Sequence, residues 1–299
     1  KVKDVTPLGV GVCDLFAGSG CVSRKLSKFF PLVSCDIQHY SRVIGNALLN
    51  KYSVTDSERS LFFDQANTRE ADNLREAFMP LIHLEQDAIT KKDLNVLTCI
   101  LEQGSAEVYS IEHNSSYLSE YQGTTIERLG LGNLNNEKSL ISRYYGGVYF
   151  SYKQAVEMDI ILEGIHRFVS PQNRDLFLAA LLSTASDIVD TVGKHFAQPI
   201  KARDSKGNIK PTVYNKAVND KTIDVIALYE EWLLKYNNLS KNDLPHQTMQ
   251  GDFEHCLNSL PESVRTVYAD PPYTRDHYSR FYHVLETIAM RDLPSISTV

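Results

Sequence analysis

The sequence predicts an α/β protein with a Rossmann-like parallel sheet and a large, mainly helical insertion. An apolar strand over 10–16 runs into a glycine-rich turn and the start of a helix. A second apolar strand, over 264–269, ends in Asp270 and two prolines, which cannot continue a sheet ladder. Between these strands, residues 55–245 show almost no strand alternation, and this is too much chain for a loop within one sheet.

Composition limits the classes of protein that the chain fits. Its 299 residues, 42% hydrophobic and 23% charged, are typical of a globular protein of one or two domains. No apolar run has the length of a membrane span, and no basic-then-apolar leader marks secretion. The cysteines form no C-x-x-C pair, so we expect no metal, no disulfide framework and a cytoplasmic location. The net charge of −6 leaves only a local basic surface for nucleic-acid contact.

The first functional motif is the turn that follows the strand over 10–16. It reads Asp14-Leu15-Phe16-Ala17-Gly18-Ser19-Gly20. Glycines let the backbone pass close beneath a ligand, and the N-terminus of the next helix offers free N–H groups. Ser23 stands where the dinucleotide fingerprint has a third glycine or alanine, so the turn alone is a weak signal.

The second motif is Asp270-Pro271-Pro272-Tyr273, directly after the strand over 264–269. It holds a carboxylate and a phenol ring at the carboxyl end of a strand, where open α/β sheets bind ligands. A hydrogen-bond acceptor beside a ring that stacks suits a flat heterocycle carrying an amino group. The alternative is a Pro-Pro turn whose tyrosine packs on the core.

Together the two motifs resemble those of S-adenosylmethionine (AdoMet)-dependent DNA methyltransferases, in particular the Dam-like, alpha-arranged adenine-N6 enzymes. In that family the glycine motif comes first, a target-recognition insertion follows, and Asp-Pro-Pro-Tyr comes last. The resemblance implies an AdoMet-binding catalytic domain over 1–55 and 246–299 and a target-recognition domain over 56–245. The family also has a helix before the glycine motif and strands after Asp-Pro-Pro-Tyr. We therefore expect a second subunit or further chain segments to complete the sheet.

The resemblance assigns AdoMet to residues at three strand ends. Asp36, which ends a strand over 32–37, would take the ribose hydroxyls, with a strand-end helix cap as the alternative. After a strand over 248–253, Asp252 would take the adenine amine and Phe253 would pack on the base. The predicted cofactor-binding residues are Asp14, Phe16, Ala17, Gly18, Ser19, Gly20, Asp36, Ile37, Asp252, Phe253 and Asp270.

The predicted catalytic residues are Asp270, Pro271, Pro272 and Tyr273. The Asp270 carboxylate and the Pro271 carbonyl would accept hydrogen bonds from the amine of the target adenine. The nitrogen lone pair would then face the sulfonium methyl, so that positioning and electrostatics do most of the work. A base inside a duplex is out of reach, so the adenine would be flipped out and stacked on Tyr273.

Two segments of the insertion are candidate DNA contacts. The first is an aromatic turn over 143–151, whose alternative role is to pack beneath the insertion. The second is a basic segment over 193–221, with a hairpin tip predicted at 204–208. This segment would contact phosphates or enter a groove, and a solvated loop is the alternative. The predicted DNA-binding residues are Tyr145, Tyr149, Lys194, Lys201, Arg203, Lys206, Lys210, Arg275 and Arg280.

These expectations favour methylation of adenine in double-stranded DNA, as the modification enzyme of a restriction-modification or phage-defence system. Cytosine-N4 enzymes usually carry Ser at the position of Asp270. RNA and protein-glutamine methyltransferases favour Asn there and lack so large an insertion. A DNA-binding specificity subunit with a degenerate methylase core is the alternative from a different class, and loss of motif residues would indicate it.

Overall fold

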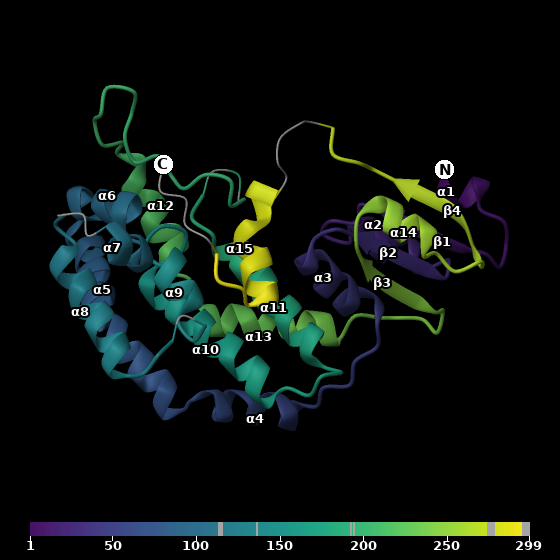
Figure 1. Cartoon of the computed structure of the whole chain (residues 1–299), viewed down its shortest axis with the longest axis horizontal. Coiled ribbons are helices and arrows are strands. Elements are labelled where there is room, and N and C mark those ends of the chain that lie inside the picture. Colours follow the sequence, from purple (N-terminus) through teal and green to yellow (C-terminus); the bar gives the residue numbers. More distant parts are fainter. Residues whose placement is uncertain (113–115, 136, 192, 194, 274–278, 295–299) are drawn as a thin grey trace.

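The computed structural model describes residues 1–112, 116–135, 137–191, 193, 195–273 and 279–294. The chain forms a small parallel sheet with short helices and a larger helical body beside it (Figure 1). The predicted α/β class with a large helical region is therefore confirmed, and the sheet is compatible with a Rossmann-like fold.

All strand pairs of the four-stranded sheet are parallel, and the strand order is β3-β2-β1-β4. Because the strands share one direction, their carboxyl ends meet at one edge of the sheet, the edge at which such folds bind ligands. The strands are β1 Gly11–Leu15, β2 Leu32–Asp36, β3 His246–Gln250 and β4 Val264–Ala269. The bounds of β4 are those predicted, because Pro271 and Pro272 stop the ladder where the sequence analysis placed the end.

Short helices connect these strands. They are α1 Val2–Val5, α2 Cys21–Leu26, α3 His39–Leu49 and α14 Phe253–Asn258. The strand predicted over 248–253 ends earlier, at Gln250. The reason is local: Oδ1 of Asp252 accepts a hydrogen bond from the amide of His255 at 2.8 Å, which makes Asp252 the N-cap of α14.

In the described residues between β2 and β3 the structure contains helices and no strand. After α3 these helices are α4 Asp56–Ala66, α5 Arg69–Lys91, α6 Leu94–Gln103, α7 Ala106–Glu112, α8 Ser119–Leu131, α9 Leu140–Tyr145, α10 Tyr152–Phe168, α11 Arg174–Ile188, α12 Thr212–Lys221 and α13 Val225–Asn237. Helix α5 continues through Pro80, although proline removes a backbone donor from the interior of a helix.

Helices α10 and α11 lie at the centre of the main hydrophobic core, which also takes in α3, α13 and the C-terminal helix α15 Ser279–Met290. Leu181, Ile161 and Ile288 are among its fully buried members. Helix α15 packs on α3 and on α11, and it stands between the sheet and the helical body (Figure 1). The helix that follows the Asp270 motif is thus part of the junction of the two regions. Trp232 of α13 is half-buried, and its indole nitrogen donates to Asp187 at 2.7 Å.

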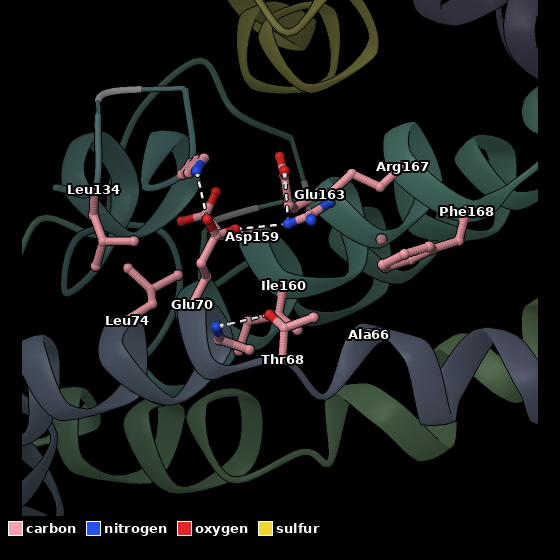
Figure 2. A pocket seen from close by; sticks show the side chains of 13 residues that line it. Ala66, Thr68, Glu70, Leu74, Leu134, Asp159, Ile160, Glu163, Arg167 and Phe168 are labelled. Atoms are coloured by element: carbon pink, nitrogen blue, oxygen red, sulfur yellow. Dashed lines mark hydrogen bonds and ion pairs between the residues drawn. The ribbon is translucent and has the colours of Figure 1, made fainter. Parts of the chain in front are cut away.

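A small cavity lies between the start of α5 and α10 (Figure 2). On its rim, Glu70 pairs with Arg167 at 2.7 Å and with Lys138 at 3.1 Å. Asp159 is buried there and caps the first turn of α9, and burial raises the pKa of its carboxyl to about 7. The cavity volume of about 20 Å³ is room for roughly one water molecule. This place is a helix junction and is too small to hold a substrate.

A buried ion pair fastens the aromatic turn to the helical body. The ammonium of Lys221, at the end of α12, contacts Glu85 of α5 at 3.0 Å, and both side chains are almost inaccessible. The same ammonium donates to the carbonyls of Gly147 at 2.9 Å and Phe150 at 3.3 Å. Lys221 belongs to the basic segment singled out in the sequence, but it is a core residue and does not belong to a basic surface.

This pair predicts a large effect of one substitution. Lys221→Met leaves the Glu85 carboxylate buried without its cation, which should lower the free energy of unfolding by about 3–5 kcal/mol. Lys206→Met removes an exposed lysine of the same basic segment and should change stability by less than about 0.5 kcal/mol. Urea denaturation of the two variants measures the difference. Equal stabilities would contradict the structural role of Lys221.

Candidate functional site

The carboxyl edge of the sheet brings together the motifs found in the sequence. The glycine turn follows β1, Asp36 ends β2, Asp252 follows β3, and the Asp-Pro-Pro-Tyr motif follows β4. Burial raises the pKa of the Asp14 carboxyl near the end of β1, and the nearby charges of Asp36 and Asp270 add to this upward shift. Asp36 and Asp270, which are 234 positions apart in the sequence (270 − 36), therefore lie at the same edge of the sheet.

The glycine turn has a backbone shape that few residues adopt. Gly18 and Gly20 have φ angles of 52° and 73°, in the left-handed region that favours glycine. A Cβ atom at Gly20 would come within 2.7 Å of Leu48, so this glycine also allows α3 to pack close. The amide of Ala17 donates to the carbonyl of Cys35 at 2.9 Å, which ties the turn to β2.

Asp36 holds the turn and the start of α3 in place. Its carboxylate accepts hydrogen bonds from the amide of Gly18 at 2.8 Å and from the amide of Gln38 at 2.9 Å. A carboxylate has about four acceptor positions, so two remain for the hydroxyls of a bound ligand. Ser41 completes the arrangement by donating to the carbonyl of Gly18 at 2.6 Å.

Asp14 lies beneath the turn and is fully buried. The Ser23 hydroxyl donates to it at 2.6 Å and lies 2.9 Å from the hydroxyl of Ser34. Burial raises the pKa of the Asp14 carboxyl, and the bond from Ser23 opposes this shift. Ser23, which departs from the dinucleotide fingerprint, therefore joins α2 to β1 and β2. Asp14 thus supports the turn from below, and its carboxyl accepts its hydrogen bond from Ser23 inside the protein.

Two aromatic rings form an apolar wall at the same edge. The ring centres of Phe16 and Phe253 are 6.3 Å apart, and the planes are tilted by 36°. Phe253 remains 48% exposed, so one of its sides is open to a ligand. Asp252 beside it is exposed, as are Ile37 and Ser19. This set offers both an apolar surface and a hydrogen-bond acceptor to a flat base.

The Asp-Pro-Pro-Tyr motif projects from the end of β4 into solvent. Tyr273 is 84% exposed, and its hydroxyl donates to the carboxylate of Asp270. The alternative in which this tyrosine packs on the core is wrong for the structure. The Asp270 charge also raises the pKa of the nearby Tyr268 hydroxyl. Arg275 lies outside the described residues.

The structure corrects the expectation for the aromatic turn. Tyr145 and Tyr149 are buried, although they were predicted to contact DNA. The Tyr145 hydroxyl donates to Thr287 of α15 at 3.1 Å, and the Tyr149 hydroxyl donates to the carbonyl of Phe196 at 3.0 Å. Both rings also pack edge-on against His283 of α15. These two tyrosines anchor α15, which is the packing alternative left open by the sequence.

The basic segment contains the expected hairpin. Arg203 and Ile209 face each other across it, and the amide of Asp204 donates to the carbonyl of Asn208 at 2.9 Å. Lys201, Arg203 and Lys206 are exposed, and Arg203 also pairs with Glu102 of α6 at 3.0 Å. The hairpin projects away from the helical body (Figure 1). The basic segment is not a loop throughout, because its last ten residues form the helix α12.

A basic hollow of about 360 Å³ lies at the base of this hairpin. No acidic residue is among its described lining, which includes His195, Lys201 and Lys210. The ring centres of His195 and Phe281 are 5.0 Å apart. The amide of Phe196 donates a hydrogen bond to the carbonyl of Phe281 at 3.0 Å. The hollow thus adjoins the start of α15, where Arg280 is exposed. Lys194 lies outside the described residues.

Sequence reasoning missed Glu286 of α15. Its carboxylate accepts hydrogen bonds from the amides of His39 at 2.8 Å and Tyr40 at 3.0 Å, so it caps the N-terminus of α3 from a position 246 residues away along the chain. An anion is favourable at a helix N-terminus. No local signal identifies such a cap, because donor and acceptor belong to opposite ends of the sequence.

Comparisons with protein-family models, with curated proteins and with solved structures find no match to this chain. Among the described residues, no helix combines the length and the apolar character needed to cross a bilayer. In the same part of the chain, no cluster of His, Cys, Asp or Glu side chains has an arrangement that could hold a metal ion. The candidate site therefore has to be interpreted from its own geometry.

The role of Asp36 predicts a local change in dynamics. Asp36→Ala removes the acceptor for the Gly18 amide, and a hydrogen bond to a charged group is worth about 1.5–3 kcal/mol. Hydrogen exchange at Gly18 should therefore become faster by about tenfold or more. Asp252→Ala is the matched control, because the carboxylate of Asp252 caps α14 and makes no contact with the Gly18 amide. Unchanged exchange at Gly18 in Asp36→Ala would show that the turn is held by other contacts.

Proposed function

We propose that the chain is an AdoMet-dependent methyltransferase that acts on the N6 amine of adenine in double-stranded DNA. The observation that carries this proposal is the position of the exposed Asp270 and Tyr273 at the carboxyl edge of a parallel sheet. The same edge bears the glycine turn and Asp36. One edge of the sheet thus carries a hydrogen-bond acceptor for an amine, a ring for stacking and a turn that could hold a nucleoside. The setting we propose is a restriction-modification or phage-defence system.

AdoMet fits the residues at this edge. The two unused acceptor positions of Asp36 suit the ribose hydroxyls, and Phe253 offers an open ring face to the adenine. Exposed Asp252 would accept from the adenine amine while it caps α14. Gly18 leaves nothing within 4 Å of the place a side chain would take, so the backbone is open to close approach by the methionine part. Bound AdoMet supplies the electrophilic methyl group.

The main task of the protein in this reaction would be to orient the adenine amine toward the methyl group. The lone pair of the adenine amine is delocalised into the ring, which makes the amine a poor nucleophile. Hydrogen bonds from the amine to Asp270 and to the Pro271 carbonyl would favour a tetrahedral nitrogen whose lone pair points at the methyl group. The hydroxyl of Tyr273 already donates to Asp270, so the ring and the carboxylate are held together before the base arrives. Such preorganised groups are the main source of catalysis in this kind of step.

The proposed DNA surface is the basic side of the helical body. Its members are the hairpin with Lys201, Arg203 and Lys206, the hollow at its base, and Arg280 on the first turn of α15. This positive surface stands out in a chain of net charge −6. Cations that replace the counterions of phosphates supply most of the sequence-independent affinity for DNA.

We propose further that β4 is covered by additional strands, from another subunit or from further chain. Among the described residues, β4 pairs only with β1. Its outward residues are exposed, including Val267 at 43%. Strands of parallel sheets are ordinarily buried on both faces, and an apolar edge is a template for pairing.

The proposal predicts that binding and turnover respond differently to two substitutions. Asp270→Ala removes the acceptor that orients the amine, so methyl transfer should fall by about 10²–10³-fold or more. AdoMet affinity should largely survive, because it rests on other residues. Asp36→Ala should instead weaken AdoMet binding. Transfer of labelled methyl to duplex DNA, with calorimetry for the cofactor, measures both effects.

Two outcomes would contradict the assignment of the active site or the activity. Methylation by Asp270→Ala at the rate of the parent would place the active site elsewhere. A parent that binds DNA specifically yet never transfers a methyl group would instead favour the specificity subunit.

The proposed DNA surface makes a separate prediction about salt. Replacing Lys201, Arg203, Lys206 and Lys210 with Ala should weaken DNA binding, and the slope of log affinity against log salt should fall by up to about four, since each lost phosphate contact changes it by about one. A control variant, Lys25→Ala with Lys51→Ala, removes exposed lysines of α2 and of the segment after α3. An unchanged slope in the first variant would remove the hairpin from the interface.

A further inference from the structure

A second basic hollow lies at the opposite edge of the sheet, away from the proposed active site. Its volume is about 280 Å³, and it is formed by α2, the end of α3 and the segment that leads into β3. Four of its lining residues have basic side chains: Arg24, Lys28, Lys241 and His246. No described acidic side chain lines it. The nearest acid in the sequence, Asp243, is exposed and pairs with Lys51.

The basic groups of this hollow are close together, and no described acid lines it. Burial and the charge of Arg24 lower the pKa of the Lys241 ammonium to about 8. The same two causes lower the pKa of His246. The Nδ1 atom of His246 is buried without a hydrogen-bond partner among the described residues. Uncompensated positive groups in a partly enclosed space are unfavourable unless an anion joins them.

Hydrogen bonds fix the positions of Arg24 and Lys241 but occupy only some of their N–H donors. Arg24 donates to the carbonyl of Ser240 at 2.8 Å, and Lys241 donates to the carbonyl of Ala47 at 2.7 Å. An arginine has five N–H donors and a lysine three, so most donors remain. Lys28 makes no ion pair or hydrogen bond with any described residue. The contact of Lys241 with Ala47 also stabilises the end of α3, and that role alone is the competing explanation for a cation there.

We propose that this hollow is a binding site for a small multivalent anion of the phosphate class, such as pyrophosphate or the phosphate chain of a nucleotide. The site is separate from the AdoMet edge and does not rest on the proposed methyltransferase activity. Its volume suits a few phosphate groups, and its basic residues come from two segments that lie far apart in the chain, 24–28 and 241–246. Hydrogen bonds from such groups to phosphate oxygens are charge-assisted and therefore strong.

The test is calorimetric titration of the full chain with inorganic pyrophosphate at constant ionic strength. We expect saturable binding of one pyrophosphate, and Lys28→Ala should weaken it by about tenfold, the value of one charge-assisted contact. Lys25→Ala is the matched control, because Lys25 is exposed in the last turn of α2, three residues before Lys28, but does not line the hollow. The affinity of this control for pyrophosphate should equal that of the parent. Pyrophosphate should also raise the melting temperature of the parent and of Lys25→Ala more than that of Lys28→Ala.

Competition identifies the source of the phosphate. Displacement of pyrophosphate by ATP, but not by a short DNA duplex, supports a free phosphorylated ligand. Displacement by the duplex, with a weaker effect in Lys28→Ala, supports a phosphate of the DNA backbone at the same site. No binding at millimolar pyrophosphate would overturn the proposal and leave the cations as helix-end contacts. Equal affinities of Lys28→Ala and Lys25→Ala would overturn it as well.

Discussion

The hydrogen bonds that Glu286 accepts from His39 and Tyr40 hold together the parts of this protein that have to act together. Glu286 belongs to α15, the helix after the Asp-Pro-Pro-Tyr motif, whereas His39 and Tyr40 begin α3, directly after the Asp36 strand end. The carboxylate satisfies amides that a helix start leaves without partners. Asp36 in turn accepts hydrogen bonds from the amides of Gly18 and Gln38, so the short segment from Asp36 to Tyr40 links α15 to the glycine turn.

The helical body holds the same helix from its other side. Tyr145 and Tyr149 of the aromatic turn contact Thr287 and His283 of α15 through a hydrogen bond and through ring edges. The turn itself is fastened by the buried pair of Lys221 and Glu85. The backbone bond from Phe196 to Phe281 joins the basic segment to the first turn of α15. The candidate DNA surface and the candidate active site are therefore attached to one helix, as the proposed methyltransferase activity would require.

Local patterns were enough to predict the sheet and its ligand edge. The strands β1, β2 and β4 are short, mostly apolar runs, and residues such as Gly18 after β1 and Pro271 after β4 mark where they stop. The bounds predicted for β3 were wrong, because its residues His246–Gln250 are largely polar and the cap by Asp252 ends it early. Burial of Tyr145 and of Lys221 did not follow, since their partners Thr287 and Glu85 lie more than a hundred residues away. Helix α4 could have been found from its capping box, in which Thr55 and Glu58 bond reciprocally. The cap by Glu286 has no counterpart in the local sequence.

The most direct test of the central claim is to sequence duplex DNA, by a method that detects modified bases, after incubation with the full-length protein and AdoMet. The account predicts N6-methyladenine at adenines within one recurring sequence context, and none in a parallel reaction without AdoMet. Methyl groups on cytosine N4 or on RNA would contradict the assigned substrate. DNA that carries no new methyl group, from a protein shown to bind AdoMet, would contradict the claim that this site methylates DNA.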